Sequence, residues 1–205
     1  MSRLLILYGT SDGHTAKIAR FLASELGWYG ANVDVVDARV SNPSPAEYVG
    51  VLVAASLHGG RYQRAVVRWV RTHAEVLRGK PSAFLSVCLE VLQKDLGVQR
   101  ELGGVVNGFE AQTGWKPARV KIVAGAVPYT RYGWLKRLVM RRKMKQAGGE
   151  TDVTRDHEYT DWADLREFAG TFHELCGGKP APVEATGKAS CGSGACCCAT
   201  EEITA

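Results

Sequence analysis

Blocks of apolar residues alternate along the chain with blocks of mixed polarity, and this alternation predicts a succession of strands and helices. Five of the apolar blocks are short and rich in valine, leucine and isoleucine. The third has hydrophobic side chains at nearly every position, which is typical of a parallel strand covered on both faces. We expect strands at residues 4–8, 32–37, 49–55, 82–87 and 120–126.

The segments between these blocks carry helical spacing of their apolar positions. The spacing is clearest at residues 63–77, whose apolar side chains fall on one face. Pro43 and Pro45 interrupt the region after the second strand, so a helix there must be short or absent. Thr160 or Asp161 can cap the last helix. We expect helices at residues 15–26, 63–77, 95–113 and 161–175.

This alternation predicts an α/β fold, namely an open, doubly wound sheet of five parallel strands in the order 2-1-3-4-5. One region departs from the minimal pattern. Residues 127–159 separate the fifth strand from the last helix, where a connection of about 2–6 residues is usual. We therefore expect one domain, residues 1–176, with an insertion at 127–159 before its last helix.

The positive charge of the chain is concentrated in this insertion. The formal net charge is +5, and seven basic residues with no acidic one lie between Arg131 and Lys145. Trp134, Leu138 and other apolar residues are interleaved with them, a pattern that suits the surface of an anionic membrane. A solvated helix at the sheet edge is the alternative. A nucleic-acid site is disfavoured, because base-stacking and groove-reading features are missing.

Composition and cysteine spacing indicate the cellular compartment of the protein. No apolar stretch approaches the roughly 20 residues that span a bilayer, and the first residues lack a secretory-signal pattern. Cys88 and Cys176 lie in apolar contexts, and the other four cysteines crowd into residues 177–205. Those four lack the C-x-x-C spacing of metal motifs and do not form a secreted disulfide framework. We expect a cytoplasmic protein with a disordered tail and no metal site.

The turn after the first strand carries the most specific chemistry. An apolar strand leads into a short loop of hydroxyl side chains and glycine, and a helix begins at about His14. Backbone N–H groups, the hydroxyls and the positive end of the helix dipole can together hold a phosphate without a lysine. The residues of this phosphate loop are Thr10, Ser11, Asp12, Gly13, His14 and Thr15.

The loop also distinguishes between classes of nucleotide. A P-loop requires a lysine after its glycine, but His14 follows Gly13. A dinucleotide fingerprint requires G-x-G-x-x-G, a spacing that Gly9 and Gly13 do not have. The loop fits a single phosphomonoester, as flavin mononucleotide (FMN) presents in sheets of this strand order. An ordinary strand–turn–helix with a Thr, Ser or Asp cap is the alternative.

Two further loops meet the phosphate loop at the carboxyl ends of the strands, where ligands bind such sheets. After the third strand, paired glycines let the backbone approach a flat ring, Tyr62 offers a stacking face, and His58 and Arg61 offer polar edges. The alternatives are a packing role for Tyr62 and a solvated loop position for His58. The candidate ring-lining residues are Ser56, Leu57, His58, Gly59, Gly60, Tyr62, Cys88, Leu89 and Glu90.

These motifs resemble a known family. The first loop fits the flavodoxin phosphate-loop pattern. More specifically, residues 12–15 are Asp-Gly-His-Thr where the flavodoxin-like protoporphyrinogen IX dehydrogenases have Asp-Gly-Gln-Thr. Two later blocks, Gly-Gly-Glu-Thr-Asp at 148–152 and Tyr-Thr-Asp-Trp at 159–162, are absent from plain flavodoxins. From residue 4 to about 175, the chain resembles the flavodoxin-like, menaquinone-dependent protoporphyrinogen IX dehydrogenases.

The resemblance implies a role in heme biosynthesis. It implies FMN as cofactor and oxidation of protoporphyrinogen IX to protoporphyrin IX, with electrons passed to menaquinone or ubiquinone. It also implies a peripheral position on the inner face of the cell membrane, reached through residues 131–145. His58 and Glu90 are acid–base candidates. The triplet Cys88-Leu89-Glu90 departs from the family, which more often has asparagine and basic residues there.

Three other functions fit the same fold, one of which is a non-enzymatic membrane-docking module that has lost its flavin; the other two are redox proteins. The first is an NAD(P)H-dependent quinone reductase. The second is a flavodoxin-type electron carrier, which the basic charge disfavours because such carriers are typically acidic and dock on basic partners.

Overall fold

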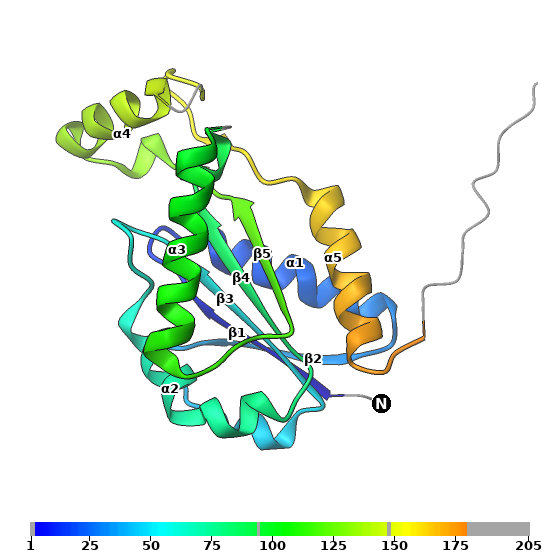
Figure 1. The fold of residues 1–205 in the computed structure, drawn as a ribbon. Coiled ribbons are helices and arrows are strands. Elements are labelled where there is room, and N and C mark those ends of the chain that lie inside the picture. Colours follow the sequence, from blue (N-terminus) through cyan, green and yellow to red (C-terminus); the bar gives the residue numbers. More distant parts are fainter. Residues whose placement is uncertain (1–2, 94, 147–148, 180–205) are drawn as a thin grey trace, which may run out of the picture.

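Five parallel strands form the centre of the protein, in the predicted order β2-β1-β3-β4-β5 (Figure 1). The computed structural model describes residues 3–93, 95–146 and 149–179. Each pair of neighbouring strands is parallel along its whole register. The doubly wound α/β fold is thus confirmed. The strands are β1 (Arg3–Gly9), β2 (Asn32–Asp37), β3 (Gly50–Ser56), β4 (Ser82–Cys88) and β5 (Arg119–Ala124).

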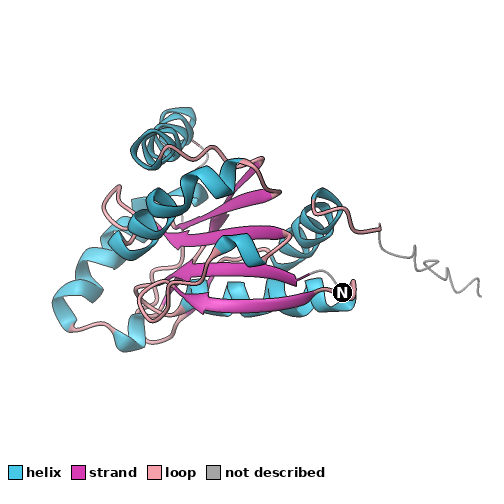
Figure 2. Cartoon of the chain, turned by 90° about the horizontal axis from the view of Figure 1, so that it is seen from below, coloured by secondary structure: helices cyan, strands magenta, loops and turns pink. Residues whose placement is uncertain are grey.

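Helices cover both faces of this sheet (Figures 1 and 2). Alternate strand residues point to opposite faces, so each strand contributes to two cores. One core packs against α1 and α5, and the other against α2 and α3. Full burial of a Leu, Ile or Val side chain stabilises the folded state by about 1.5–3 kcal/mol. The helices are α1 (His14–Trp28), α2 (Arg64–Arg78), α3 (Leu96–Thr113), α4 (Trp134–Gln146) and α5 (Trp162–Leu175).

Three short 3-10 helices complete the regular structure. After β2, where prolines predicted a short or absent helix, the chain forms only η1 (Pro45–Glu47). The others, η2 (Glu90–Leu92) and η3 (Tyr129–Arg131), lie in loops at the carboxyl end of the sheet. Both of these loops reach the site described below.

The fifth strand is shorter than expected. β5 ends at Ala124, and the next residues form β6 (Ala126–Val127), which pairs antiparallel with β7 (His157–Glu158). Gly125 lies at the break: its N–H donates to the Cys88 carbonyl, and its own carbonyl accepts from the Tyr159 N–H. The expected strand at 120–126 is therefore two strands, because Gly125 turns the chain out of the sheet.

The insertion leaves and rejoins the sheet edge through this β6–β7 pair. Between them lie η3 and α4, and α4 stands beyond the carboxyl end of the sheet (Figure 1). The inner side of the insertion has its own small core of Val127, Tyr129, Tyr132 and Met144. The insertion is therefore anchored at its base, while α4 is largely outside the main cores.

The start of α5 shows which of its two predicted caps operates. The Asp161 carboxylate accepts from the Asp164 N–H at 3.0 Å, as an N-cap does. Thr160 has a different role, because its hydroxyl donates to the Ala124 carbonyl at 2.8 Å. The cysteines at 191 and 196–198, and most of the tail expected to be disordered, lie outside the described residues.

Candidate functional site

The phosphate loop connects β1 to α1 in a conformation that depends on glycine. Gly13 has φ +92°, a left-handed conformation that other residues rarely adopt, and its N–H donates to the Thr10 hydroxyl at 2.9 Å. Gly13 is also the N-cap of α1, so the helix begins without a side-chain cap. Its first N–H groups and its positive dipole end are therefore available to an anion.

A second observation supports an anion at this position. The Thr15 hydroxyl, in the first turn of α1, is buried and has no hydrogen-bond partner. A buried hydroxyl without a partner costs about 1–3 kcal/mol. A phosphate ester at the helix N-terminus would supply the missing acceptor. The residues of the loop thus fit the phosphate of a mononucleotide.

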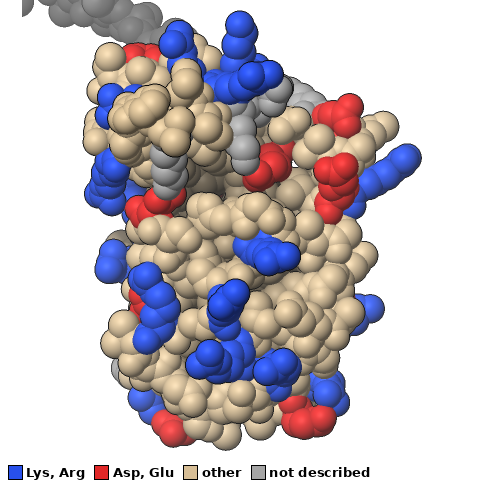
Figure 3. Space-filling view, turned by 90° about the vertical axis from the view of Figure 1, so that its left-hand side faces the viewer, with Lys and Arg blue, Asp and Glu red and all other residues tan. Residues whose placement is uncertain are grey.

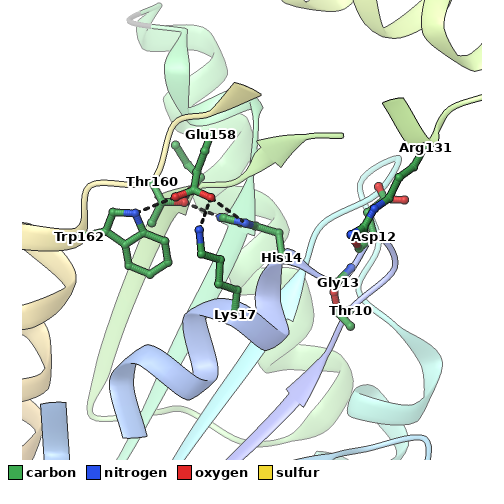
Figure 4. Close-up of polar contacts among 10 residues, drawn as sticks. Thr10, Asp12, Gly13, His14, Lys17, Arg131, Glu158, Thr160 and Trp162 are labelled. Carbon is green, nitrogen blue, oxygen red and sulfur yellow. Dashed lines mark hydrogen bonds and ion pairs between the residues drawn. The ribbon is translucent and has the colours of Figure 1, made fainter. Parts of the chain in front are cut away.

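The insertion contacts the phosphate loop from both sides (Figure 4). On one side, the Tyr132 hydroxyl donates to the Asp12 carboxylate at 3.0 Å, and the Arg131 guanidinium donates to the Asp12 carbonyl at 3.3 Å. On the other side, residues of β7 and the segment after it contact the beginning of α1. The loop is therefore held by residues more than a hundred positions away in the sequence.

The second of these contacts centres on His14 and Glu158. The Thr160 hydroxyl donates to Ala124, so it accepts from His14 Nε2, which lies 2.6 Å away. The other ring nitrogen, Nδ1, faces the Glu158 carboxylate at 3.8 Å. Burial lowers the pKa of His14, although Glu158 opposes the shift. The neutral imidazole with its proton on Nε2 is thus the form that this network favours.

Glu158 is held as a carboxylate by its other neighbours. Lys17 Nζ lies 2.6 Å from one oxygen, and the Trp162 indole N–H donates to the other at 2.8 Å. Burial raises the pKa of Glu158, but these hydrogen bonds outweigh it and the pKa is lowered overall. Glu158 therefore ties α1 to α5 as well as to the insertion.

A cavity of about 310 Å³ opens beside the phosphate loop, at the carboxyl ends of β1, β3 and β4. Most of the predicted site residues line it, and they come from all three predicted loops. Those that do are Thr10, Asp12, His14, Thr15, Ser56, Leu57, His58, Gly59, Cys88, Leu89 and Glu90. The three loops thus meet at one site.

Tyr62 is the main correction to the predicted site. Its ring lies in the core with centroids 5.1 Å from those of Phe84 and Phe109, and its hydroxyl is 2.9 Å from that of Ser86. It does not line the cavity, because the chain turns back into α2 at this residue. Gly60 also faces away from the cavity and lines a groove beside α2. The packing alternative therefore holds for Tyr62.

The loop between β3 and α2 forms a tight turn at the rim of the cavity. Gly59 and Gly60 have φ +57° and +73°, and His58 and Arg61 exchange backbone hydrogen bonds across them. This turn needs glycine at both central positions. His58 is exposed at the rim. Within the phosphate loop, Ser11 and Gly13 support the backbone without lining the cavity, and Ser11 accepts from the Gln63 amide.

The third loop presents a buried thiol and a partly buried carboxylate. Burial raises the pKa of Cys88 to about 11, which favours the protonated thiol at neutral pH. Glu90 begins η2 and is half-buried at the cavity wall. Both residues line the cavity.

Sequence reasoning did not identify the side of the cavity that the insertion forms. Tyr132, directly after η3, and Met140 and Met144 of α4 line the cavity. The two methionines are four residues apart and so share one face of the helix, a spacing that predicts the shared face but not the cavity beside it. The other unpredicted lining residues are Val87, Gln93, Gly125 and Ala126.

The fold and the phosphate loop together define a flavodoxin-type mononucleotide-binding protein. A family model described as a flavodoxin domain matches residues 5–154. The protoporphyrinogen IX dehydrogenase [quinone] of Escherichia coli (strain K12) is 38% identical over 174 residues, which cover 84% of this chain and 96% of that protein. The protein of the same name from Leishmania major is 38% identical over 178 residues, covering 84% of this chain and 75% of its own.

The chain therefore belongs to the flavodoxin domain family and, within it, to the family of the protoporphyrinogen IX dehydrogenases (quinone). Among solved structures, oxidised flavodoxin 1 from Bacillus cereus superposes with a TM-score of 0.52 at 13% identity, covering 84% of this chain and 98% of that one. That likeness concerns the fold alone.

Proposed function

We propose that the protein is an FMN-dependent oxidoreductase that converts protoporphyrinogen IX to protoporphyrin IX and passes the electrons to a respiratory quinone. Relatives that are 38% identical over 84% of this chain carry that activity in their names. The observation that carries the proposal is the cavity, which has the phosphate loop on one side and the insertion on the other. One wall suits the cofactor, and the opposite wall suits an apolar substrate.

The residues divide into two groups by what they would do. Thr15, the first N–H groups of α1 and the backbone around Gly13 would hold the phosphate, and the loop at 56–59 would lie along the ring. FMN, when bound, supplies an acceptor of two electrons that can reduce a quinone. Met140 and Met144 would cover the cavity with apolar, adaptable surface and keep water from the reacting faces.

His58 and Glu90 are the proposed acid–base residues. His58 is exposed at the rim, where it could exchange protons with solvent, and Glu90 is half-buried in the wall. Either could take a proton that leaves the porphyrinogen, since both lie on loops beside the cavity.

The proposal includes contact between the insertion and an anionic membrane on its cytoplasmic side, where menaquinone or ubiquinone would be reached. No helix in the described part of the chain is long and apolar enough to cross a bilayer. α4 nevertheless exposes large apolar side chains: Trp134 is 79% exposed, and Leu135 and Leu138 are 59% exposed. Exposed basic residues, including Arg141, Arg142 and Lys145, accompany them. Both kinds of side chain would contribute to contact with an anionic membrane surface.

The test begins with the purified protein. We expect the yellow absorbance of bound flavin, which bleaches under anaerobic conditions on addition of protoporphyrinogen IX and returns on addition of menaquinone. NADPH in place of the porphyrinogen should leave the flavin oxidised. Reduction by NADPH alone would instead support the quinone reductase and exclude the proposed reaction.

A further inference from the structure

A second concave surface lies outside the candidate site, between the first turns of α2 and the second half of α3. This groove, of about 600 Å³, is lined by four arginines, Arg61, Arg64, Arg68 and Arg71. Three of them occupy positions i, i+4 and i+7 of α2 and so form a stripe along one side of that helix. We call these four residues and the surface between them the arginine groove.

The arginines of the groove have no counter-charge on the described part of the protein. No ion pair joins any of the four to a described carboxylate, whereas Arg78, at the end of the same helix, pairs with Glu75 at 2.9 Å. Like charges three or four residues apart destabilise a helix by about 0.2–0.5 kcal/mol for each pair. An anion from outside the protein would remove this repulsion.

The groove also has apolar lining residues. They are Val67 on α2 and Val105 and Phe109 on α3. All four arginines are exposed, so their guanidinium groups are accessible to an anion from outside the protein. The groove therefore offers both cationic and apolar contacts to an amphipathic anion.

The groove and α4 lie on the same side of the molecule. Figure 1 places α2, α3 and α4 on its left, and Figure 3 looks onto that side, where Lys and Arg side chains gather over the lower half. The turn at residues 58–61 connects the two surfaces, because Gly59 lines the cavity and Gly60 lines the groove. A flat, extended partner can therefore contact α4 and the groove at once, with the rim of the cavity between them.

We propose that the arginine groove binds the phosphate headgroups of anionic lipids and forms, with α4, a docking face in two parts. This inference rests on the membrane contact under the proposed function and extends it to an element outside the insertion. Two contacts fix the orientation of the protein, whereas α4 alone leaves it free to rotate on the bilayer. The orientation that results places the rim of the cavity at the membrane surface, where quinone is dissolved.

The experiment measures co-sedimentation of the full-length protein with vesicles. One set contains phosphatidylcholine alone, and the other contains phosphatidylcholine with 30% phosphatidylglycerol. The test variant carries Arg64→Gln, Arg68→Gln and Arg71→Gln. Because each basic residue near an anionic surface contributes roughly fivefold to partitioning, we expect a loss of roughly a hundredfold on the anionic vesicles and none on the neutral ones. Absorbance of bound flavin shows that the variant is folded.

A matched pair separates local charge from total charge. Arg68→Gln should weaken binding to anionic vesicles roughly fivefold, while Arg20→Gln, an exposed position of α1 on the opposite face of the sheet, should not change it. Equal effects of the two variants would show a response to net charge alone and would overturn the inference.

The remaining outcomes distinguish this inference from the proposed function. Wild-type protein that ignores both kinds of vesicle would contradict the membrane contact itself. Wild-type binding that Leu138→Ser abolishes, with the triple variant unaffected, would leave α4 as the docking site and overturn the role of the groove. A triple variant that keeps vesicle binding but loses affinity for protoporphyrin IX would assign the arginines to a tetrapyrrole carboxylate instead.

Discussion

The phosphate loop and the insertion meet at the same atoms but are built in opposite ways. The loop is six consecutive residues whose conformation is set locally, by the left-handed Gly13 and the hydrogen bond to Thr10. The insertion reaches that loop through Tyr132, directly after η3, and through Glu158 of β7, whose neighbour Thr160 contacts His14. One half of this site is therefore formed by a short sequence motif, and the other half depends on contacts between residues far apart in the sequence.

The largest effect should follow from a change in the loop itself. Gly13→Val forces a β-branched residue into φ +92°, so the loop cannot keep its shape and the purified protein should contain no flavin. Gly30→Val is the matched control, because Gly30 also has a positive φ, +80°, at the far end of α1. Similar backbone strain with normal flavin content is expected there. Flavin loss in both variants would attribute the effect to general destabilisation.

A smaller effect is expected at the unpartnered hydroxyl. Thr15→Val keeps the shape of the side chain but removes the donor, and FMN affinity should fall roughly 10- to 100-fold, as for a hydrogen bond to a charged group. Titration of the apoprotein by flavin fluorescence quenching measures this. Thr72→Val, at an exposed position of α2, serves as control. Unchanged affinity in Thr15→Val would remove this hydroxyl from the phosphate site.

The insertion should contribute less to cofactor binding than the loop. Tyr132→Phe deletes the hydrogen bond to Asp12 without changing the packing of the ring, and FMN affinity should fall roughly 3- to 10-fold because the loop is less preorganised. Hydrogen exchange at residues 132–146 should also become faster. Tyr29→Phe, remote from the loop, should change neither quantity. An unchanged exchange rate in Tyr132→Phe would mean that the insertion does not depend on its contact with the loop.

The smallest effect concerns pH. The pKa of His14 is lowered in the folded protein, so below about pH 6.5 the unfolded chain binds a proton that the folded chain resists. The folded protein is therefore not destabilised by His14 above that pH, and its free energy of unfolding decreases as the pH falls below it. The melting temperature of the wild-type protein should therefore drop more between pH 7.5 and 5.5 than that of His14→Gln. Parallel curves would contradict the assigned protonation state.

The main fold could be predicted because each element has its own local signal. The apolar blocks at β1, β3 and β4 and the one-sided helix α2 predicted the elements, and the alternation of five strands with helices predicted the order 2-1-3-4-5 that the sheet has. Gly125 shows the limit: a continuous apolar run spans the point where the chain leaves the sheet, and the Tyr159 N–H that bonds to the Gly125 carbonyl there comes from a distant part of the chain.

The candidate site was predictable to a similar degree. The residues of the three loops lie at the ends of strands, where the topology brings them together. The prediction for Tyr62 was wrong because a tyrosine near two glycines has the same sequence pattern whether it faces a ligand or the core. Its ring lies in the core because it packs against Phe84 and Phe109. Met140 and Met144 were missed because only the position of α4 over the cavity gives them a role.

The most direct test of the account replaces residues 133–155 by a short glycine–serine linker and compares the product with the wild-type protein. The phosphate loop and the β6–β7 pair stay intact, so FMN should still bind, more weakly. Under anaerobic conditions with menaquinone, formation of fluorescent porphyrin from protoporphyrinogen IX should be lost in the shortened protein and present in the wild type. Equal rates of porphyrin formation in the two proteins would contradict the division of the site between the phosphate loop and the insertion.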